Sequence, residues 1–228
     1  MSLAPVTELA CWLGVDIGKI KDPAALLLLQ RARTFTPGGF DPASGEAGAW
    51  KTRYAVLFLE RLPLGTSYPA VVERLASVCD SLAAQESVTG PLIEVVIDVT
   101  GVGRPVLDMV LAKRLKTRGV VGVNYTGGQV AREAGDRIYN VPKRDLVAQP
   151  VLLFQSGELQ ISEKLPDAPV LVNELVNFQE SLTAAGNATY GNDGKRAKND
   201  DYVNTLALAA WRAVSKAPRP MDGTQRLW

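Results

Sequence analysis

The apolar residues of this 228-residue chain change their spacing at about residue 69. Before that point they form strand-like runs at residues 11–16, 24–30 and 54–61. After it they recur at intervals of three and four residues, which is the spacing of one face of an α-helix. We therefore expect three strands joined as an antiparallel meander, with residues 31–50 as a long loop between the second and third strands.

The rest of the chain alternates predicted strands with predicted helices. Strands are expected at 92–97, 120–125 and 158–161, and helices at 69–82, 104–116, 143–154, 168–182 and 200–214. Residues 126–141 are predicted to form a loop or hairpin, and residues 186–198 a polar loop. A β-α-β-α-β succession gives parallel strands. The predicted class is thus α/β, with three antiparallel strands followed by parallel strands and flanking helices, which is a ribonuclease H-like order.

Composition limits the chemistry that is open to the chain. Histidine is absent, which excludes a histidine base, a Ser-His-Asp triad and a histidine-ligated zinc site. Cys11 and Cys79 lie in apolar segments and are expected to be core residues, which fits a reducing cytoplasm. The sequence has neither a secretory signal nor an apolar run of the ~18–20 residues that span a bilayer. Catalysis would therefore have to use carboxylates, lysines, hydroxyls or metals.

Two aspartates stand where apolar strands are predicted to end. Asp16 lies in Gly-Val-Asp-Ile-Gly and Asp98 in Val-Ile-Asp-Val-Thr-Gly. Aspartate is a poor strand former, and its charge is costly to bury, so both positions call for a reason. One reason is capping of the next turn or helix. The other is that adjacent strand ends bring the two carboxylates together, where a divalent cation neutralises their repulsion.

An acidic pair opens the last predicted helix. Asp200 and Asp201 precede an apolar stretch rich in alanine and leucine, and Asn204 shares a helix face with Asp201. Acids are favoured at helix N-termini, but two in succession exceed what capping needs. We therefore predict that Asp16, Asp98 and Asp201 form a catalytic metal site with Asp200 as a further ligand, and which member of the acid pair is the principal ligand stays open.

Carboxylate and water ligands suit Mg²⁺ or Mn²⁺. Two such ions ~3.5–4 Å apart can hydrolyse a phosphodiester without any histidine. The expected cofactors are therefore Mg²⁺ or Mn²⁺, as two ions.

At these residues the sequence resembles the nuclease domain of the large subunit of tailed-phage terminases. The resemblance runs from about residue 11 to 214 and is carried by segments 14–25, 97–108, 141–147 and 200–209. It implies a metal-dependent DNA endonuclease that cuts concatemeric phage DNA during genome packaging. It also implies double-stranded DNA as substrate, the terminase small subunit and portal protein as partners, and the cytoplasm of an infected or lysogenic bacterial host as location.

Two features depart from the family pattern. Asn199 stands where members often carry a histidine, which leaves more of the metal binding to the acid pair that follows. The chain also lacks the Gly-x-x-x-x-Gly-Lys-Ser/Thr loop of the family's ATPase motor. We therefore expect an excised domain or a nuclease without its motor, which binds no nucleotide and does not translocate DNA by itself.

The nuclease domain is expected at 11–216, between an N-terminal extension at 1–10 and a flexible tail at 217–228. The net charge of +1 gives no argument for nucleic acid, although basic residues gather locally. The cluster at 113–118 ends a predicted helix and is interpreted as solvated surface. The residues expected to bind DNA phosphates are Arg104, Arg132, Arg137, Lys143, Arg144, Lys195, Arg196 and Lys198.

The sequence leaves three other functions open. A resolvase for four-way DNA junctions would use the same acids on the same fold. A non-catalytic scaffold that binds DNA or a partner predicts no metal-dependent cutting. The Gly14–Gly18 segment also resembles the phosphate-binding loop of sugar kinases and actin-like ATPases, but Lys19 and Ile20 replace the hydroxyl residue needed there.

Overall fold

The computed structural model describes residues 6–18, 22–41, 46–85, 93–101, 103–182, 188–192 and 200–216. Three of the predicted DNA-binding residues, Lys195, Arg196 and Lys198, lie outside these ranges, as do Asn199 and the predicted tail.

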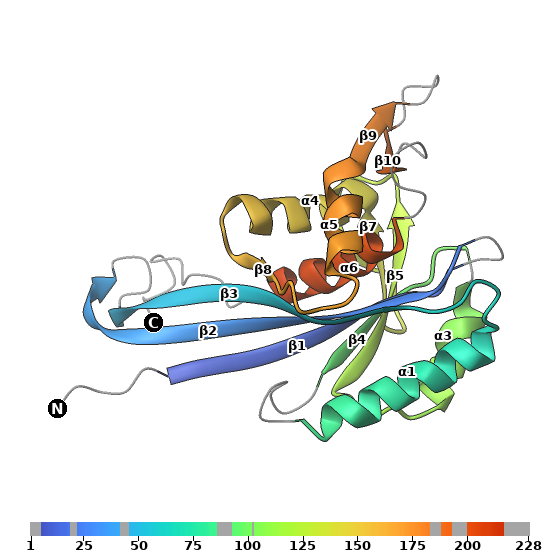
Figure 1. Cartoon of the computed structure of the whole chain (residues 1–228), viewed down its shortest axis with the longest axis horizontal. Helices are drawn as coiled ribbons and strands as arrows, with labels where there is room; N and C mark the ends of the chain where they lie inside the picture. Colours follow the sequence, from blue (N-terminus) through green and yellow to red (C-terminus); the bar gives the residue numbers. More distant parts are fainter. Residues whose placement is uncertain are drawn as a thin grey trace.

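Within the described residues, eight strands form one mixed sheet in the order β6-β7-β5-β4-β1-β2-β3-β8 (Figure 1). The meander consists of β1 (Val6–Asp16), β2 (Ala25–Asp41) and β3 (Glu46–Arg61), paired antiparallel. The strands β4 (Glu94–Asp98), β5 (Gly119–Thr126) and β7 (Ile138–Pro142) extend the sheet from β1 as parallel neighbours. The edges are β6 (Arg132–Glu133), antiparallel to β7, and β8 (Leu159–Ile161), parallel to β3. This is the α/β, ribonuclease H-like arrangement predicted from the sequence.

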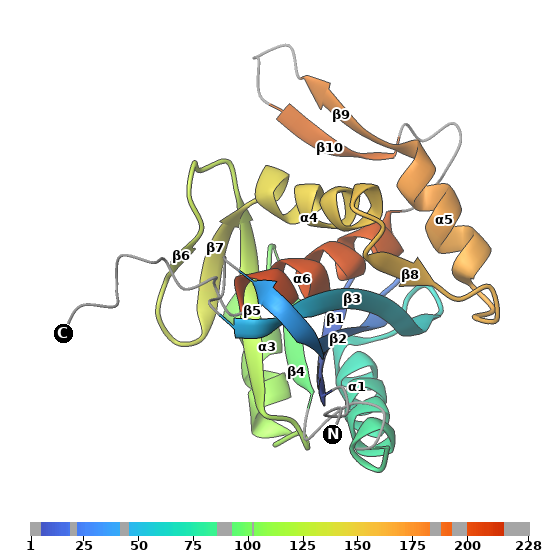
Figure 2. The same ribbon diagram turned by 90° about the vertical axis from the view of Figure 1, so that its left-hand side faces the viewer.

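Helices cover both faces of the sheet (Figure 2). One face carries α4 (Lys143–Gln155), α5 (Ala168–Asn177) and α6 (Asp201–Ser215), and the other carries α1 (Tyr68–Ala83) and α3 (Gly103–Ala112). Successive strand residues point to opposite faces, so Trp12 packs in the core under α6 and Leu13 in the core over α1. The two helical layers therefore enclose two separate apolar cores.

The close packing of α6 on β1 fixes the position of the acid pair. A Cβ atom on Gly14 would lie 2.1 Å from the carbonyl oxygen of Thr205, so only glycine allows the helix backbone to come this near the strand. Because Gly14 and Thr205 each lie close to a predicted site residue, this contact carries the start of α6 toward the carboxyl end of β1.

The prediction of a long loop at 31–50 is wrong. The strands β2 and β3 continue through most of it as a two-stranded ribbon, in which Arg33 pairs with Thr52 and Phe35 with Trp50. The rings of Phe35 and Trp50 lie 5.2 Å apart, and the Arg33 guanidinium lies over Trp50. Apolar spacing did not predict this ribbon, because the ribbon lies beyond the helical layers and has no continuous apolar face. The first strand likewise begins at Val6, whereas the apolar pattern predicts a start at residue 11.

The predicted helix at 168–182 is also too long. Helix α5 ends at Asn177, and β9 (Phe178–Leu182) then pairs with β10 (Ala188–Asn192). The second predicted helix, at 104–116, ends at Ala112, because Arg114 adopts a left-handed backbone with φ of 50°. The expected loop or hairpin at 126–141 is a hairpin whose second strand, β7, is part of the main sheet.

Other expectations about the surface and the core are confirmed. Cys11 and Cys79 are buried free thiols. In the basic cluster at 113–118, Lys113 pairs with Glu73 and Lys116 with Asp80 at the surface. Arg118 departs from this expectation, because its guanidinium lies over the buried Trp12 ring and 3.7 Å from Glu94. None of the described helices is long and apolar enough to cross a membrane.

Candidate active site

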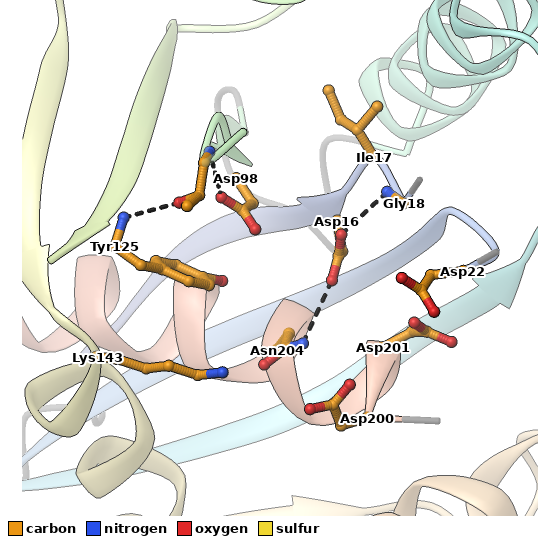
Figure 3. Close-up of a pocket in the computed structure, with 11 residues that line it drawn as sticks. Asp16, Ile17, Gly18, Asp22, Asp98, Tyr125, Lys143, Asp200, Asp201 and Asn204 are labelled. Atoms are coloured by element: carbon orange, nitrogen blue, oxygen red, sulfur yellow. Dashed lines mark hydrogen bonds between the residues drawn. The ribbon is translucent and has the colours of Figure 1, made fainter. Parts of the chain in front are cut away.

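The carboxyl ends of β1 and β4 place two of the predicted acids side by side. The strands are parallel, and Val15 pairs with Ile97. Asp16 and Asp98 are the next residues of these strands, so they lie at the same level on neighbours that are ~4.8 Å apart. Both line a pocket of about 420 Å³, together with Asp22 and the acid pair at the start of α6. Figure 3 shows these carboxylates around Asp16, with Asp98 on one side and Asp22, Asp200 and Asp201 on the other. The structure thus brings together all four acids named from the sequence.

Asp16 is held by groups on both sides of the pocket. Its carboxylate accepts hydrogen bonds from the Gly18 amide at 3.0 Å and from the side-chain amide of Asn204 at 3.4 Å. Gly18 has φ of +69°, and a Cβ atom there would lie 2.4 Å from the Asp22 carbonyl oxygen, so the turn requires glycine. Burial raises the pKa of Asp16, the two hydrogen bonds oppose the rise, and neighbouring carboxylates add to it. A cation in the pocket would favour the charged form of this acid.

Asp98 makes a turn contact and also faces the pocket. Its Oδ1 accepts a hydrogen bond from the Thr100 amide at 2.7 Å, and the Thr100 hydroxyl accepts one from the Tyr125 amide at 2.8 Å. The interpretation of Asp98 as a cap is therefore correct in part, because its carboxylate accepts a backbone hydrogen bond in the turn after β4. Its position in the pocket wall beside Asp16 goes beyond what that turn needs.

The acid pair does not cap α6 through its side chains. Asp200 occupies the N-cap position but makes no side-chain capping hydrogen bond. Glu174 of α5 performs this role instead, since its Oε2 accepts hydrogen bonds from the amides of Tyr202 at 2.9 Å and Val203 at 3.3 Å. Capping thus fails to explain why two acids stand at this helix start, and both carboxylates line the pocket.

Asp201 is buried against an arginine at the end of β3. Asp201 is only 4% exposed, and Arg61 Nε lies 3.1 Å from its Oδ2. Neither atom has a hydrogen-bond partner, so this contact is an ion pair without hydrogen-bond alignment. Arg61 also pairs with Glu174, and its guanidinium lies 4.4 Å from the centre of the Tyr202 ring. Burial raises the pKa of Asp201 to about 7, Arg61 opposes the shift, and the neighbouring carboxylates add to it.

Lys143 is the one described lining residue of this pocket with a positive charge. Its ammonium lies 5.9 Å from the centre of the Tyr125 ring, and its side chain extends toward Asn204 and Asp200 in Figure 3. Burial raises the pKa of Asp200, and Lys143 opposes that rise. A lysine predicted only as a phosphate contact therefore lies within the carboxylate pocket itself.

The donors of the pocket fit a hard divalent cation. The described lining residues carry five carboxylates, those of Asp16, Asp22, Asp98, Asp200 and Asp201, against the single ammonium of Lys143. The buried Oδ2 of Asp201 has no hydrogen-bond donor. Among the described residues no group of three or more acids is drawn together tightly enough to enclose an ion. Mg²⁺ needs no such cage, because it commonly binds through one or two carboxylates and completes its shell with water and substrate phosphates.

Apart from Lys143, none of the predicted DNA-binding residues is among the described residues that line this pocket. Arg144 donates hydrogen bonds to the backbone and side-chain oxygens of Gln129, at 2.9 and 2.8 Å. Arg132 in β6 and Arg137 in the β6–β7 turn are exposed. Arg104 lies in the first turn of α3, and its side chain is outside the described part of the chain.

Three residues at the site escaped the sequence-based prediction. Asp22 lies in the segment 14–25 that resembles the terminase family, but it was not predicted as a site residue. Arg61 ends a strand and gave no signal, since its partners are far away in sequence. Glu174 did give a sequence signal, because it is an acid next to Leu175 in the apolar stripe of a predicted helix. In the structure Glu174 is 2% exposed. A buried acid on such a stripe needs a partner.

No protein-family model matches the chain, and no curated protein matches it by sequence. Solved structures do match. The large terminase nuclease from thermophilic phage G20c has a TM-score of 0.53 at 23% identity, over 89% of this chain and 81% of that one. The same nuclease with bound magnesium has a TM-score of 0.57 at 20% identity, over 90% and 82%.

A manganese-soaked terminase nuclease domain from human cytomegalovirus also matches, with a TM-score of 0.51 at 13% identity, over 90% of this chain and 82% of that one. At these identities the likeness is one of fold. The chain therefore has the ribonuclease H-like fold of terminase nuclease domains.

Proposed function

We propose that this chain is a divalent-metal-dependent DNA endonuclease of the terminase large-subunit type, which cuts concatemeric phage DNA during genome packaging. The observation that carries the proposal is the pocket of five carboxylates, two of which open α6 without capping it. Among the described residues, five carboxylates beside only two cations, Arg61 and Lys143, repel one another, so a structural role explains them poorly. The fold shared with terminase nucleases, one of them with bound magnesium, supports the same function.

In this proposal Asp16, Asp98 and Asp201 hold two ions of Mg²⁺ or Mn²⁺, with Asp200 as a further ligand. Such ions, when bound, lower the pKa of water and stabilise the oxygen that leaves the phosphorus atom. The chain's own groups orient the ligands. The Gly18 and Asn204 amides fix the Asp16 carboxylate, and the Thr100 amide fixes that of Asp98. Groups of this kind around a metal site keep its ligands in place.

The substrate in this proposal is double-stranded DNA held mainly through its phosphates. Lys143 lies where it can neutralise a phosphate beside the carboxylates. Contacts to phosphates do not depend on the base sequence, which fits a nuclease of low sequence specificity. The set proposed to make these contacts is Arg104, Arg132, Arg137, Lys143, Arg144, Lys195, Arg196 and Lys198. The terminase small subunit, the portal protein and the cytoplasm of the bacterial host belong to the same proposal.

Incubation of the purified chain with supercoiled plasmid tests the class of function. We expect nicked and linear products with Mn²⁺ or Mg²⁺ and none with EDTA. An intact plasmid in every metal would favour a non-catalytic scaffold. A parallel reaction with a synthetic four-way junction tests the resolvase alternative, because a strong preference for junction over duplex would favour a resolvase.

A further inference from the structure

A second pocket adjoins the carboxylate pocket on the side of α1. Its volume is about 540 Å³, and it shares Ile17 and Asp22 with the carboxylate pocket. Its far wall is the turn between β3 and α1 and the first turn of that helix, including Pro63, Thr66 and Tyr68. In Figure 3 the Ile17 side chain points away from the acids. The two pockets are therefore neighbours, and Ile17 and Asp22 contribute to the wall of both.

The lining of this second pocket is chemically unlike that of the first. Its described residues include two prolines, an isoleucine and a tyrosine, and Asp22 is the one charged residue among them. The start of α1 offers little to an anion, because Pro69 has no amide hydrogen and Ser67 already accepts from the Ala70 amide at 3.4 Å. The pocket thus suits a flat, weakly polar group better than a phosphate.

In a DNA strand, the groups next to each phosphate are a deoxyribose and a flat base. Tyr68 lines the pocket and is 37% exposed, so it supplies an accessible aromatic side chain beside it. Bases stack on aromatic side chains whatever their identity, because each base has a π-face. A base inside a duplex is paired and stacked, so it reaches a recess in the protein only after it leaves the helix.

We propose that this pocket, lined by Ile17, Asp22, Pro63, Thr66, Tyr68 and Pro69, binds an unpaired nucleotide next to the phosphodiester that is cut. The inference rests on the proposed nuclease function, since the carboxylate pocket supplies the neighbouring phosphate position. Its consequence is a preference for DNA that is locally unpaired at the cut. Tyr68 is the residue that confers this preference by stacking on the displaced base.

The test compares two labelled DNA duplexes of equal length, one fully paired and one with a short central bubble. Fluorescence anisotropy gives the Kd of each, with Ca²⁺ in place of Mg²⁺ as the oxygen-liganded cation, and gel electrophoresis of the same samples checks that the DNA is uncut. We expect the wild-type chain to bind the bubble about tenfold more tightly, which lies within the ~1–3 kcal/mol that a stacked base contributes. Tyr68→Ala and Tyr68→Gln should bind both duplexes with the wild-type affinity for paired DNA, whereas Tyr68→Phe should keep the preference.

Leu64→Ala is the matched control, because Leu64 lies in the same turn, is 63% exposed and is not part of the pocket wall. It should keep the full preference for the bubble. Equal binding of the two duplexes by the wild type, or a preference that survives in Tyr68→Ala, would overturn the inference. If the wild type cuts plasmid but ignores the bubble, this inference alone fails. If it neither binds nor cuts DNA, the proposed function fails with it.

Discussion

At the scale of single residues, the site depends on how a small number of charges are balanced. Arg61 lies between two buried carboxylates, those of Asp201 and Glu174, whose side chains are 5% and 2% exposed. One guanidinium therefore compensates two acids. The same arginine connects the end of β3 to both helices that carry these acids.

Arg61→Gln should destabilise the chain strongly, because it leaves both carboxylates buried without a cation. We expect a loss of ~3–5 kcal/mol in the free energy of unfolding, the usual effect of breaking a buried ion pair on one side. Urea denaturation followed by circular dichroism measures it. Arg74→Gln is the matched control, since Arg74 pairs with Glu60 near the surface and should cost under ~1 kcal/mol. Similar losses for the two variants would contradict this account of Arg61.

At the scale of elements, a buried ion pair holds the C-terminal half of α6 against the sheet. Glu94 of β4 accepts hydrogen bonds from Arg212 at 2.8 and 3.1 Å and from the Trp12 indole at 3.0 Å. Burial opposes the ionisation of Glu94, but Arg212 and the other donors lower its pKa below the ordinary 4.5. With the close contact at Gly14, this pair determines how α6 lies across β1 and β4.

The lowered pKa of Glu94 gives the pair a definite pH dependence. A carboxyl with a lowered folded pKa stabilises the protein above the unfolded value, and this contribution is lost as pH falls through the folded pKa. Glu94→Gln should therefore cost ~3–5 kcal/mol at pH 7, where Arg212 is left unpaired. The difference in the free energy of unfolding between Glu94→Gln and the wild type should become smaller as pH falls below 4.5. Unfolding curves at several pH values check this, and a gap that stays constant would contradict it.

Much of this architecture could be predicted from the sequence, and the parts that could not have physical causes. The central strands and α6 carry continuous or periodic apolar residues, so their positions could be predicted. The outer half of the β2–β3 ribbon is held by cross-strand pairs such as Phe35 with Trp50, which apolar spacing does not reveal. Asp16 and Asp98 were found because an acid at a strand end is unusual. Arg61 and Glu174 act through partners distant in sequence, which one sequence does not disclose.

At the scale of the whole molecule, the described basic residues differ in whether acids neutralise them. Lys143 lies within the pocket, and Arg132 and Arg137 are exposed on the β6–β7 hairpin, next to the strand that leads into α4. Lys113 and Lys116 instead form surface ion pairs with acids of α1. The DNA path that we propose therefore crosses the molecule over the hairpin and the pocket.

Replacing Arg132 and Arg137 together by alanine should weaken binding equally for DNA of any sequence. It should also flatten the plot of log binding constant against log salt concentration by ~0.9 for each DNA phosphate that the variant no longer neutralises. Binding isotherms at several salt concentrations give this slope. The double variant Lys113→Ala, Lys116→Ala is the control and should keep the wild-type slope. An unchanged slope for the arginine variant would mean that these arginines only face solvent.

The most direct test of the central claim is the rate at which Asp98→Asn cuts plasmid DNA in Mn²⁺, measured beside Asp80→Asn. Asp80 is a surface acid of α1 paired with Lys116, so its amide variant controls for the loss of one negative charge. We expect Asp98→Asn to remain folded by circular dichroism and to lose at least ~100-fold in rate, which is ~3 kcal/mol of transition-state stabilisation. Asp80→Asn should cut at the wild-type rate. A folded Asp98→Asn that cuts as fast as the wild type would contradict the assignment of this pocket as the nuclease site.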